Sequence, residues 1–177
     1  LMMNRNKRGI AVDLKSADGK RVLRRLLEAA DVLTESYRRG VMERMGFGYE
    51  ALKRDYPRLV YCSVSGFGRT GPYADRAGFD LVAQGVSGIM SVTGKPDEGP
   101  MRVGTAIGDV TSGLYLSFGI LAALLERETS GRGQMVDTSL MEALIALMDF
   151  QSAAWLVDKK VPQQQGNDHP KSMPTSA

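Results

Sequence analysis

The sequence is poor in the two residue types that most often build metal sites and catalytic triads. Its 177 residues include one cysteine and one histidine. Because a disulfide needs two thiols, the chain cannot form one internally, and Cys62, in the apolar run 59–64, is interpreted as a buried strand thiol. The single His169 lies in a polar stretch. The chain alone therefore supplies neither a histidine-based metal cluster nor a local Ser-His-Asp triad, and no metal is expected.

The sequence also has only a small excess of positive over negative residues, and it has few long apolar runs. The 23 lysines and arginines are interspersed with 20 acidic residues, which gives a net charge of +3. Nucleic-acid binding needs a clustered basic face with stacking aromatic side chains, so no nucleic-acid partner is expected, whereas a bound nucleotide phosphate is compatible. We find no apolar run of membrane-spanning length and no signal peptide. We therefore expect no membrane partner and a cytoplasmic location.

The chain has the length of one domain, and both of its ends resemble cuts. A sizeable core fits in 177 residues of which 43% are apolar. The sequence opens directly on the approach to a strand and closes on KSMPTSA without a structural stop. We therefore expect part of a longer protein, with a partial large domain over residues 1–157 and a polar linker over residues 158–177 that leads to a further domain.

Hydrophobic periodicity predicts strands and helices in alternation. Short apolar runs are typical of strands, and stripes with a spacing of three to four residues are typical of helices, the first of them capped by Ser16. This alternation predicts an α/β fold with an open, mostly parallel Rossmann-like sheet flanked by helices. The predicted strands are 9–14, 31–37, 58–64 and 134–138, and the predicted helices are 17–30, 40–45, 49–56, 79–92, 110–127 and 139–157.

The segment 66–71 matches the GxGxxG spacing of dinucleotide-binding loops. Such a loop should open a long helix and be followed, about 20 residues on, by an acidic residue at the end of a second strand. Here Pro72 and Tyr73 follow the loop, and that distance ends near Ser91. The sequence therefore favours a plain glycine-rich connection over an NAD site.

One carboxylate, Asp109, stands at the start of the longest apolar helix. The first turn of a helix has unpaired N–H groups and a positive dipole end, so a carboxylate there is expected to stay ionised. Leucines and alanines surround the helix 110–127 almost completely, which predicts burial against the sheet. Gly104 and Gly108 would let a ligand or another backbone come close. Two interpretations are open at this point: a reactive carboxylate, or an ordinary aspartate cap in a tight turn.

Seven segments in a fixed order carry a family resemblance. They are 6–15 (NKRGIAVDLK), 31–37 (DVLTESY), 57–61 (PRLVY), 63–68 (SVSGFG), 71–73 (GPY), 106–109 (AIGD) and 129–134 (TSGRGQ). Over essentially its whole length the chain resembles the class III CoA-transferases, the CaiB/BaiF family. The resemblance implies a Rossmann-like large domain, with an N-terminal segment and a small C-terminal domain outside this sequence. It also implies a homodimer of interlocked rings.

The resemblance implies a role for Asp109. In this family the aspartate of the Gly-Asp pair before the long helix is the nucleophile, and Asp109 matches it. It would attack the thioester of an acyl-CoA to form a mixed anhydride and then an aspartyl-CoA thioester, from which CoA passes to an acceptor acid. The resemblance thus implies acyl-CoA and a carboxylic acid as substrates. Coenzyme A is a substrate here, and no tightly bound cofactor is expected.

The same resemblance implies the coenzyme contacts. Lysine and arginine would pair with the CoA phosphates, and Tyr37 or Met45 would pack on the adenine. Many relatives carry asparagine before the aromatic residue of the second strand, where this chain has Ser36, so the adenine contact differs there. The implied contacts are Val12, Asp13, Leu14, Lys15, Ser36, Tyr37, Arg38, Arg44, Ala77, Gly78, Phe79 and Asp80.

Two alternatives to CoA transfer stay open. The related 2-methylacyl-CoA racemases carry a histidine where this chain has Phe79, and a two-base racemase needs a second proton acceptor, so the sequence favours a transferase. The other alternative is a non-catalytic CoA-binding fragment or interaction module. Because the resemblance assigns further parts of the site to segments outside this sequence, we expect the chain alone to have little activity.

Overall fold

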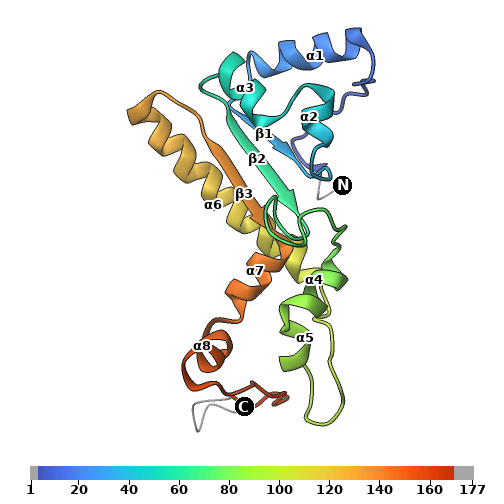
Figure 1. The fold of residues 1–177 in the computed structure, drawn as a ribbon, viewed down its shortest axis with the longest axis vertical. Coiled ribbons are helices and arrows are strands. Elements are labelled where there is room, and N and C mark those ends of the chain that lie inside the picture. The colour runs from blue at the N-terminus through green and yellow to red at the C-terminus, as the bar shows by residue number, and fades with distance from the viewer. Residues whose placement is uncertain (1–3, 170–177) are drawn as a thin grey trace.

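The computed structural model describes residues 4–169, and within them the chain forms a three-stranded parallel sheet (Figure 1). In spatial order the strands are β1 (Val32–Glu35), β2 (Val60–Ser65) and β3 (Met135–Ser139). Both pairings are parallel, and Cys62 of β2 lies opposite Val136 of β3. The predicted α/β fold with an open parallel sheet flanked by helices is confirmed.

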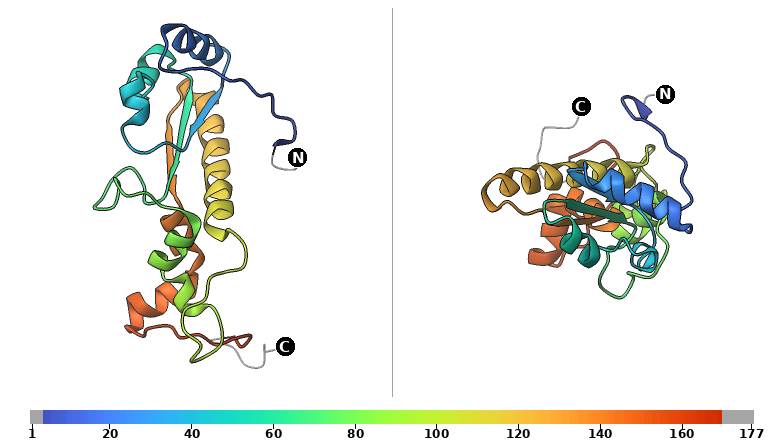
Figure 2. Two further views of the ribbon diagram at one scale, coloured as in Figure 1. Left: turned by 90° about the vertical axis from the view of Figure 1, so that its right-hand side faces the viewer. Right: turned by 90° about the horizontal axis from the view of Figure 1, so that it is seen from above.

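The central strand β2 is buried on both faces, and its alternate side chains enter two different cores. On one face Val60 and Cys62 pack with the long helix α6 (Ile107–Ser130), which lies along β2 and β3 (Figure 2). On the other face Tyr61 packs in a cluster with Phe47. Cys62 is fully buried, as predicted, and burial raises the pKa of its thiol to about 11.

Three short helices pack on the face of the sheet opposite α6. Leu27, Met42 and Leu52 bring one side chain from each of these helices into the core around Tyr61. The sheet is therefore covered on both faces, as parallel sheets require. The helices are α1 (Ala17–Leu27), α2 (Val41–Met45) and α3 (Tyr49–Asp55).

The predicted strand 9–14 is wrong. These residues have no regular structure and pair with no strand of the described sheet, and Ile10 is 65% exposed. A strand exists only where a neighbour supplies backbone partners, and an alternating pattern cannot supply one. The segment instead leads into α1, where Ser16 is the predicted cap and accepts a hydrogen bond from the amide of Gly19 at 2.9 Å.

The predicted helix 79–92 is broken into two pieces. Gly88, with a φ of 87°, separates α4 (Asp80–Ser87) from α5 (Ile89–Val92). A left-handed glycine ends a helix in this way because it turns the chain out of the helical path. The hydrophobic pattern continues across the break, which is why the sequence predicted one helix.

The predicted helix 139–157 is also interrupted. It forms α7 (Leu140–Leu147) and α8 (Asp149–Asp158), which are bent by 78° relative to each other. Ser139 caps α7 by accepting from the amide of Glu142 at 3.1 Å. Asp149, at the bend, has a φ of 34°, so the backbone leaves the helical path there although the side chains stay apolar.

Helix α6 begins three residues before its predicted start and is buried along one side only. One side packs on β2 and β3, and the other carries an apolar stripe whose residues are 53% to 74% exposed. The predicted burial of this helix against the sheet is confirmed, but only one side of the apolar helix is covered. The exposed stripe consists of Val110, Leu114, Phe118, Leu121 and Leu125.

By length and composition alone, α6 could cross a membrane. It has 24 residues and is apolar enough for this. The bent pair of α7 and α8, taken together as one segment, is also long and apolar enough. The expectation that no apolar run reaches membrane-spanning length is therefore wrong. In this structure α6 lies against β2, β3 and α7, which is the arrangement of a helix that packs on a sheet.

The first part of the predicted linker packs back on the chain. After α8, Gln164 donates through Nε2 to the carbonyl oxygens of Thr93 and Gly99, at 2.6 Å each. This contact joins the end of the described chain to the loop that follows α5. Residues 170–177 of the predicted linker lie outside the described residues.

A small core joins α4, α6 and α7. Leu144 of α7 is fully buried there with Ala83 of α4 and Leu140, and Ile107 of α6 packs against them. A Cβ on Gly108 would lie only 3.1 Å from Cδ1 of Leu144, so α6 and α7 approach closely at this point. This core holds the start of α6 against its two neighbours.

We expect Leu144→Ala to lower the free energy of unfolding by about 2–5 kcal/mol, because it leaves a cavity among closely packed side chains. Leu144→Met nearly conserves the volume and should cost less than about 1.5 kcal/mol. Urea unfolding of the two variants and the unsubstituted protein measures both values. An Leu144→Ala variant as stable as the unsubstituted protein would show that this core does not support the fold.

Candidate active site

Asp109 lies in the first turn of α6, as its third residue, and is exposed. The N-cap is Ala106, which makes no side-chain cap hydrogen bond, so the interpretation of Asp109 as an ordinary N-cap is wrong. Within residues 4–169 the carboxylate of Asp109 makes no hydrogen bond and no ion pair. It is therefore available to a ligand.

Asp109 lines a pocket of about 660 Å³ at the carboxyl ends of the strands. Ser36 follows β1, Ser65 ends β2 and Leu140 follows β3, so all three strands contribute to it. This is the edge of an open parallel sheet at which ligands are expected. Four of the predicted coenzyme contacts share this pocket with Asp109, namely Ser36, Gly78, Phe79 and Asp80.

The pKa of Asp109 is raised above the ordinary aspartate value of 3.8. Burial of part of the carboxylate is the larger cause, and the negative charge of Asp80 is the second. The unpaired amides of the helix start act in the opposite direction and do not outweigh these two causes. Asp109 is therefore a more basic carboxylate than an aspartate with the ordinary pKa, which favours its use as a nucleophile.

Two glycines let the backbone cross itself beside this pocket. A Cβ on Gly78 would come within 2.6 Å of the Cα of Gly66, so neither position has room for a side chain. The hydroxyl of Ser65 holds the loop by accepting from the amide of Gly68 at 2.9 Å. In the described chain the next helix begins only at α4, so the GxGxxG segment is the plain connection that the sequence favoured.

Asp80 and Gln84 of α4 tie the start of α6 to that helix. Asp80 accepts from the amide of Gly108 through Oδ1 at 2.8 Å and from the Gln84 side chain through Oδ2 at 2.7 Å. Gln84 also accepts from the amide of Val103 at 2.8 Å and donates to the carbonyl of Thr105 at 3.3 Å. The carboxylate of Asp80, implied as a coenzyme contact, is thus bound to protein groups in this structure.

Ion pairs hold the end of β1, where further coenzyme contacts are predicted. The buried Glu35 accepts from the amide of Tyr37 at 2.7 Å and from Arg69 at 3.1 Å. Arg69 also pairs with Glu43 of α2. The glycine-rich loop, β1 and α2 are joined in this way, and the amide of Tyr37 is held by Glu35.

The other predicted coenzyme contacts lie outside the pocket that contains Asp109. The segment 12–15 leads into the amino end of α1, where Asp13 accepts from the amide of Lys15 at 2.9 Å. The side chains of Arg38 and Arg44 are exposed. The contacts outside the pocket are Val12, Asp13, Leu14, Lys15, Tyr37, Arg38, Arg44 and Ala77.

No motif in the sequence marks the polar residues that support the site. Gln84 belongs to no motif, and its one signal is an amide within the largely apolar stretch LVAQGV. Arg69 lies inside the GxGxxG segment, and that motif gives no reason to expect an ion pair from this position. Ser65 and Ser112 also line the pocket, and nothing in their spacing marks them.

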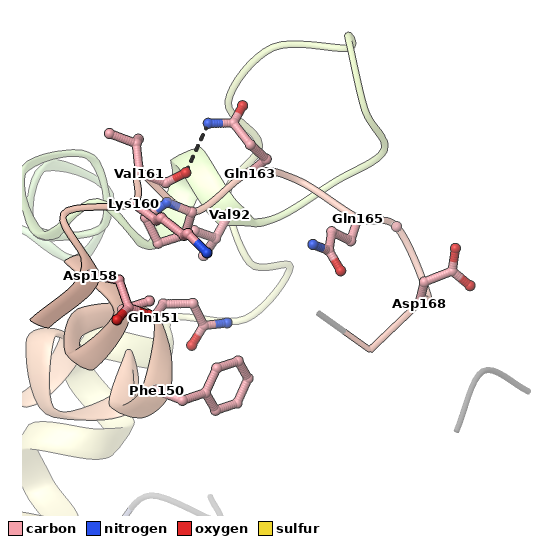
Figure 3. A pocket seen from close by; sticks show the side chains of 12 residues that line it. Val92, Phe150, Gln151, Asp158, Lys160, Val161, Gln163, Gln165 and Asp168 are labelled. Atoms are coloured by element: carbon pink, nitrogen blue, oxygen red, sulfur yellow. Dashed lines mark hydrogen bonds between the residues drawn. The ribbon is translucent and has the colours of Figure 1, made fainter. Parts of the chain in front are cut away.

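A second cavity, of about 440 Å³, lies between α8 and the residues that follow it. Figure 3 shows Phe150 and Gln151 of α8 beside Lys160 and Val161 at this cavity. Within the described chain, no predicted site residue lines it. The two cavities share no lining residue, so the second is separate from the site at Asp109.

Comparison with known proteins connects the chain to one family. A family model described as CoA-transferase family III matches residues 1–177. A succinate–glutarate CoA-transferase of Agrobacterium fabrum is 43% identical over 171 residues, which are 97% of this chain and 43% of that protein. An acetyl-CoA:oxalate CoA-transferase of Acetobacter aceti is 40% identical over 173 residues, which are 97% of this chain and 44% of that protein. The chain thus spans less than half the length of these relatives.

The fold is also similar to that of solved structures. A CaiB/BaiF family protein from Brucella suis matches with a TM-score of 0.89 and 41% identity, over 95% of this chain and 44% of that protein. The sequence match and the structural match therefore cover the same chain almost completely and name the same family. The chain belongs to CoA-transferase family III.

Proposed function

We propose that the protein carrying this chain transfers CoA from an acyl-CoA thioester to a carboxylic acid, with Asp109 as the nucleophile. The observation that carries the proposal is the Asp109 carboxylate, which is exposed at a pocket and has no hydrogen-bond or ion-pair partner within the described residues. Family membership and the CoA-transferase names of the relatives support the reaction class.

In the first half of the reaction, the carboxylate of Asp109 attacks the thioester carbonyl carbon of the acyl-CoA. The C–S bond breaks, CoA leaves as a thiolate, and a mixed anhydride forms on Asp109. The thiolate then attacks the aspartyl carbonyl, which releases the donor acid as a carboxylate and leaves an aspartyl-CoA thioester. Neither step transfers a proton, so a pocket lined by no histidine suits this chemistry.

In the second half, the acceptor carboxylate attacks the aspartyl-CoA thioester and expels the thiolate, which gives a second mixed anhydride. The thiolate attacks the acyl carbonyl of the acceptor, so a new acyl-CoA forms and Asp109 returns as a carboxylate. Carboxylates both enter and leave at the anhydrides, so one residue can carry CoA through the cycle without a strong base. The raised pKa of Asp109 favours the one attack that this carboxylate makes, on the thioester of the donor acyl-CoA.

We propose that the phosphates of the coenzyme bind outside the pocket, at exposed cations near the strand ends. Lys15 lies beside the amino end of α1, where unpaired amides favour a negative charge. Arg38 follows β1 and Arg44 lies in α2, and both side chains are exposed. The coenzyme would then be held at these cations while its thioester reaches Asp109.

The remaining features of the proposal rest on the family resemblance alone. The residues 158–177 lead to a small domain that completes the site, and the whole protein is an interlocked homodimer in the cytoplasm. Coenzyme A acts as a substrate, with no tightly bound cofactor. For the same reason, we expect the isolated chain to show little activity.

Asp109→Ala should remove the covalent intermediate. After the full-length protein is incubated with acyl-CoA and then hydroxylamine, the unsubstituted form should carry a hydroxamate on Asp109, detected by mass spectrometry. CoA transfer should fall by roughly ten-thousandfold or more, the scale of losing a covalent nucleophile. Asp75→Asn, which changes an exposed carboxylate paired with Arg39, is the control and should stay fully active. If the Asp109→Ala variant still gains a hydroxamate after the same treatment, on another residue, Asp109 is not the nucleophile.

Lys15→Ala and Arg38→Ala should each raise the KM for acyl-CoA roughly tenfold, because each removes a charge-assisted contact to phosphate. The value of kcat should stay within about twofold, because these side chains lie away from the reacting atoms. Arg25→Ala, in the last turn of α1, is the matched control and should change neither constant. If the KM for acyl-CoA changes equally in Lys15→Ala, Arg38→Ala and the control Arg25→Ala, the phosphate assignment is contradicted.

A racemase of the same family would exchange the α-proton of its substrate with solvent. Phe79, at the position where the related racemases carry histidine, is 74% exposed at the pocket. We expect no solvent deuterium at the α-carbon of a 2-methylacyl-CoA in a sample that transfers CoA, as measured by mass spectrometry. Deuterium uptake faster than CoA transfer would favour the racemase, and loss of both activities would favour a non-catalytic CoA-binding module.

A further inference from the structure

The side chain of Gln84 is a fully buried amide beside the site, and each of its polar atoms has a partner. Its Oε1 accepts from the amide of Val103, and its Nε2 donates to Oδ2 of Asp80 and to the carbonyl of Thr105. A backbone amide can only donate, so Val103 fixes which end of the Gln84 side chain carries the oxygen. The Nε2 group is thereby directed at Asp80.

This orientation of Gln84 requires Asp80 to act as a hydrogen-bond acceptor. Both oxygens of Asp80 act as acceptors, one from Gln84 and one from the amide of Gly108. A proton on either oxygen would face an N–H group, so the carboxylate is the form that satisfies both hydrogen bonds. Gln84 thus presents a donor, and not an acceptor, to Asp80.

The amide that Asp80 binds belongs to the residue before Asp109. A Cβ on Gly108 would lie 3.0 Å from Oδ1 of Asp80, so the two residues are closely packed at this contact. Asp80 and Gln84 are one helical turn apart on α4, and together they hold three backbone groups between residues 103 and 108. The irregular segment that leads into α6 is therefore fixed from one face of α4.

We propose that Gln84 is a positioning residue for the reaction: it orients Asp80, and through Asp80 and the amide of Gly108 it fixes the carboxylate of Asp109 at the pocket. The inference rests on the proposed function, since it gives Asp109 the role of nucleophile. A reacting group displaced by about 1 Å can lose roughly 100-fold in rate, so the tie to α4 has a measurable consequence. Gln84 itself touches no reacting atom.

Asp80 also acts on Asp109 through its charge. Its negative charge is the second cause of the raised pKa of Asp109, after burial. The residues lining the pocket come from the end of β1, from β2, from α4 and the segment before it, from α6 and from α7, and among these lining residues Asp80 and Asp109 are the carboxylates. A pH profile of the reaction therefore reports on Asp109, whose pKa the charge of Asp80 raises.

Gln84→Glu keeps the size of the side chain and the acceptor for Val103, but it places a carboxylate oxygen where Nε2 donates to Asp80. That oxygen can face Asp80 only while it carries a proton. We expect the ratio of kcat/KM, variant to unsubstituted protein, to be near one at about pH 5 and to fall roughly 100-fold by about pH 8. The KM for acyl-CoA should stay within about twofold. Gln163→Glu, at an exposed glutamine, is the matched control and should leave this ratio unchanged.

The double variant Asp80→Asn with Gln84→Glu reverses the polarity of the pair. The asparagine amide would donate to the glutamate, and the asparagine oxygen would still accept from Gly108. Near neutral pH, we expect the kcat/KM of the double variant to be about tenfold higher than that of Gln84→Glu, because the two positions are coupled. A double variant no more active than Gln84→Glu would overturn the positioning role.

Asp80→Asn gives a readout that a purely structural role would not move. The charge of Asp80 raises the pKa of Asp109, so its removal lowers that pKa. The attacking form of Asp109 is the carboxylate, and the acid limb of kcat/KM should therefore move to lower pH. An acid limb that stays in place would show that Asp80 does not act on Asp109, and the path from Gln84 to Asp109 that the inference proposes would then fail. This measurement decides the matter even where circular dichroism shows that Gln84→Glu is unfolded.

Failure of this inference is distinguishable from failure of the proposed function. If Asp109→Ala keeps the hydroxamate label, Asp109 is not the nucleophile, whatever Gln84 does. If Asp109→Ala loses the label while Gln84→Glu behaves like Gln163→Glu at every pH, the proposed function stands and Gln84 does not position Asp109.

Discussion

The close contact of α4, α6 and α7 around Gly108 is the constraint on which the site depends. Because Gly108 has no Cβ, Asp80 reaches its amide from α4 while Leu144 packs against it from α7. A side chain at this position would force the side chains of Asp80 and Leu144 to give way by a few tenths of an ångström, and so would disturb the contact that Asp80 and Gln84 make with the segment before α6. The place of Asp109 follows from this contact, since it is the next residue of the same helical turn.

Two neighbouring carboxylates at a helix start also affect stability. The raised pKa of Asp109 means that the folded chain binds its proton more tightly than the unfolded chain. The free energy of unfolding therefore falls as pH rises through the interval between the unfolded and folded pKa values, and Asp109 opposes folding at neutral pH. The two hydrogen bonds to Asp80 and the buried Leu144 act in the other direction. The fold thus tolerates an energetically unfavourable negative charge on Asp109, the group that the proposed reaction uses, as functional sites commonly do.

What the sequence predicts correctly is what local evidence determines. Ser16 caps α1 and Cys62 lies in a buried strand, because each depends on residues within a few positions. The strand 9–14 is wrong because its partner would have to come from elsewhere in the chain. Gln84 is missed for the same reason, since it binds Val103, 19 residues away, and Asp80 binds an amide 28 residues away. For Asp109 the local pattern left two interpretations open and gave the helix start as the dominant influence on its charge, whereas burial and Asp80 from another helix raise its pKa.

The apolar surface left open near Asp109 bears on the same chemistry. A mixed anhydride reacts with water, so the proposed reaction needs a pocket from which water is excluded. In this chain Phe79 and Leu81, which line the pocket, are 74% and 53% exposed, and Val110 beside Asp109 is 53% exposed. The chain spans 43% of its relative from Agrobacterium fabrum, so most of that protein lies outside the residues seen here. A cover over these side chains would exclude water from the anhydride. By further burial it would also raise the pKa of Asp109, in the same direction as the charge of Asp80 does. Protection of the intermediate and activation of the nucleophile therefore require the same change: less water at the start of α6.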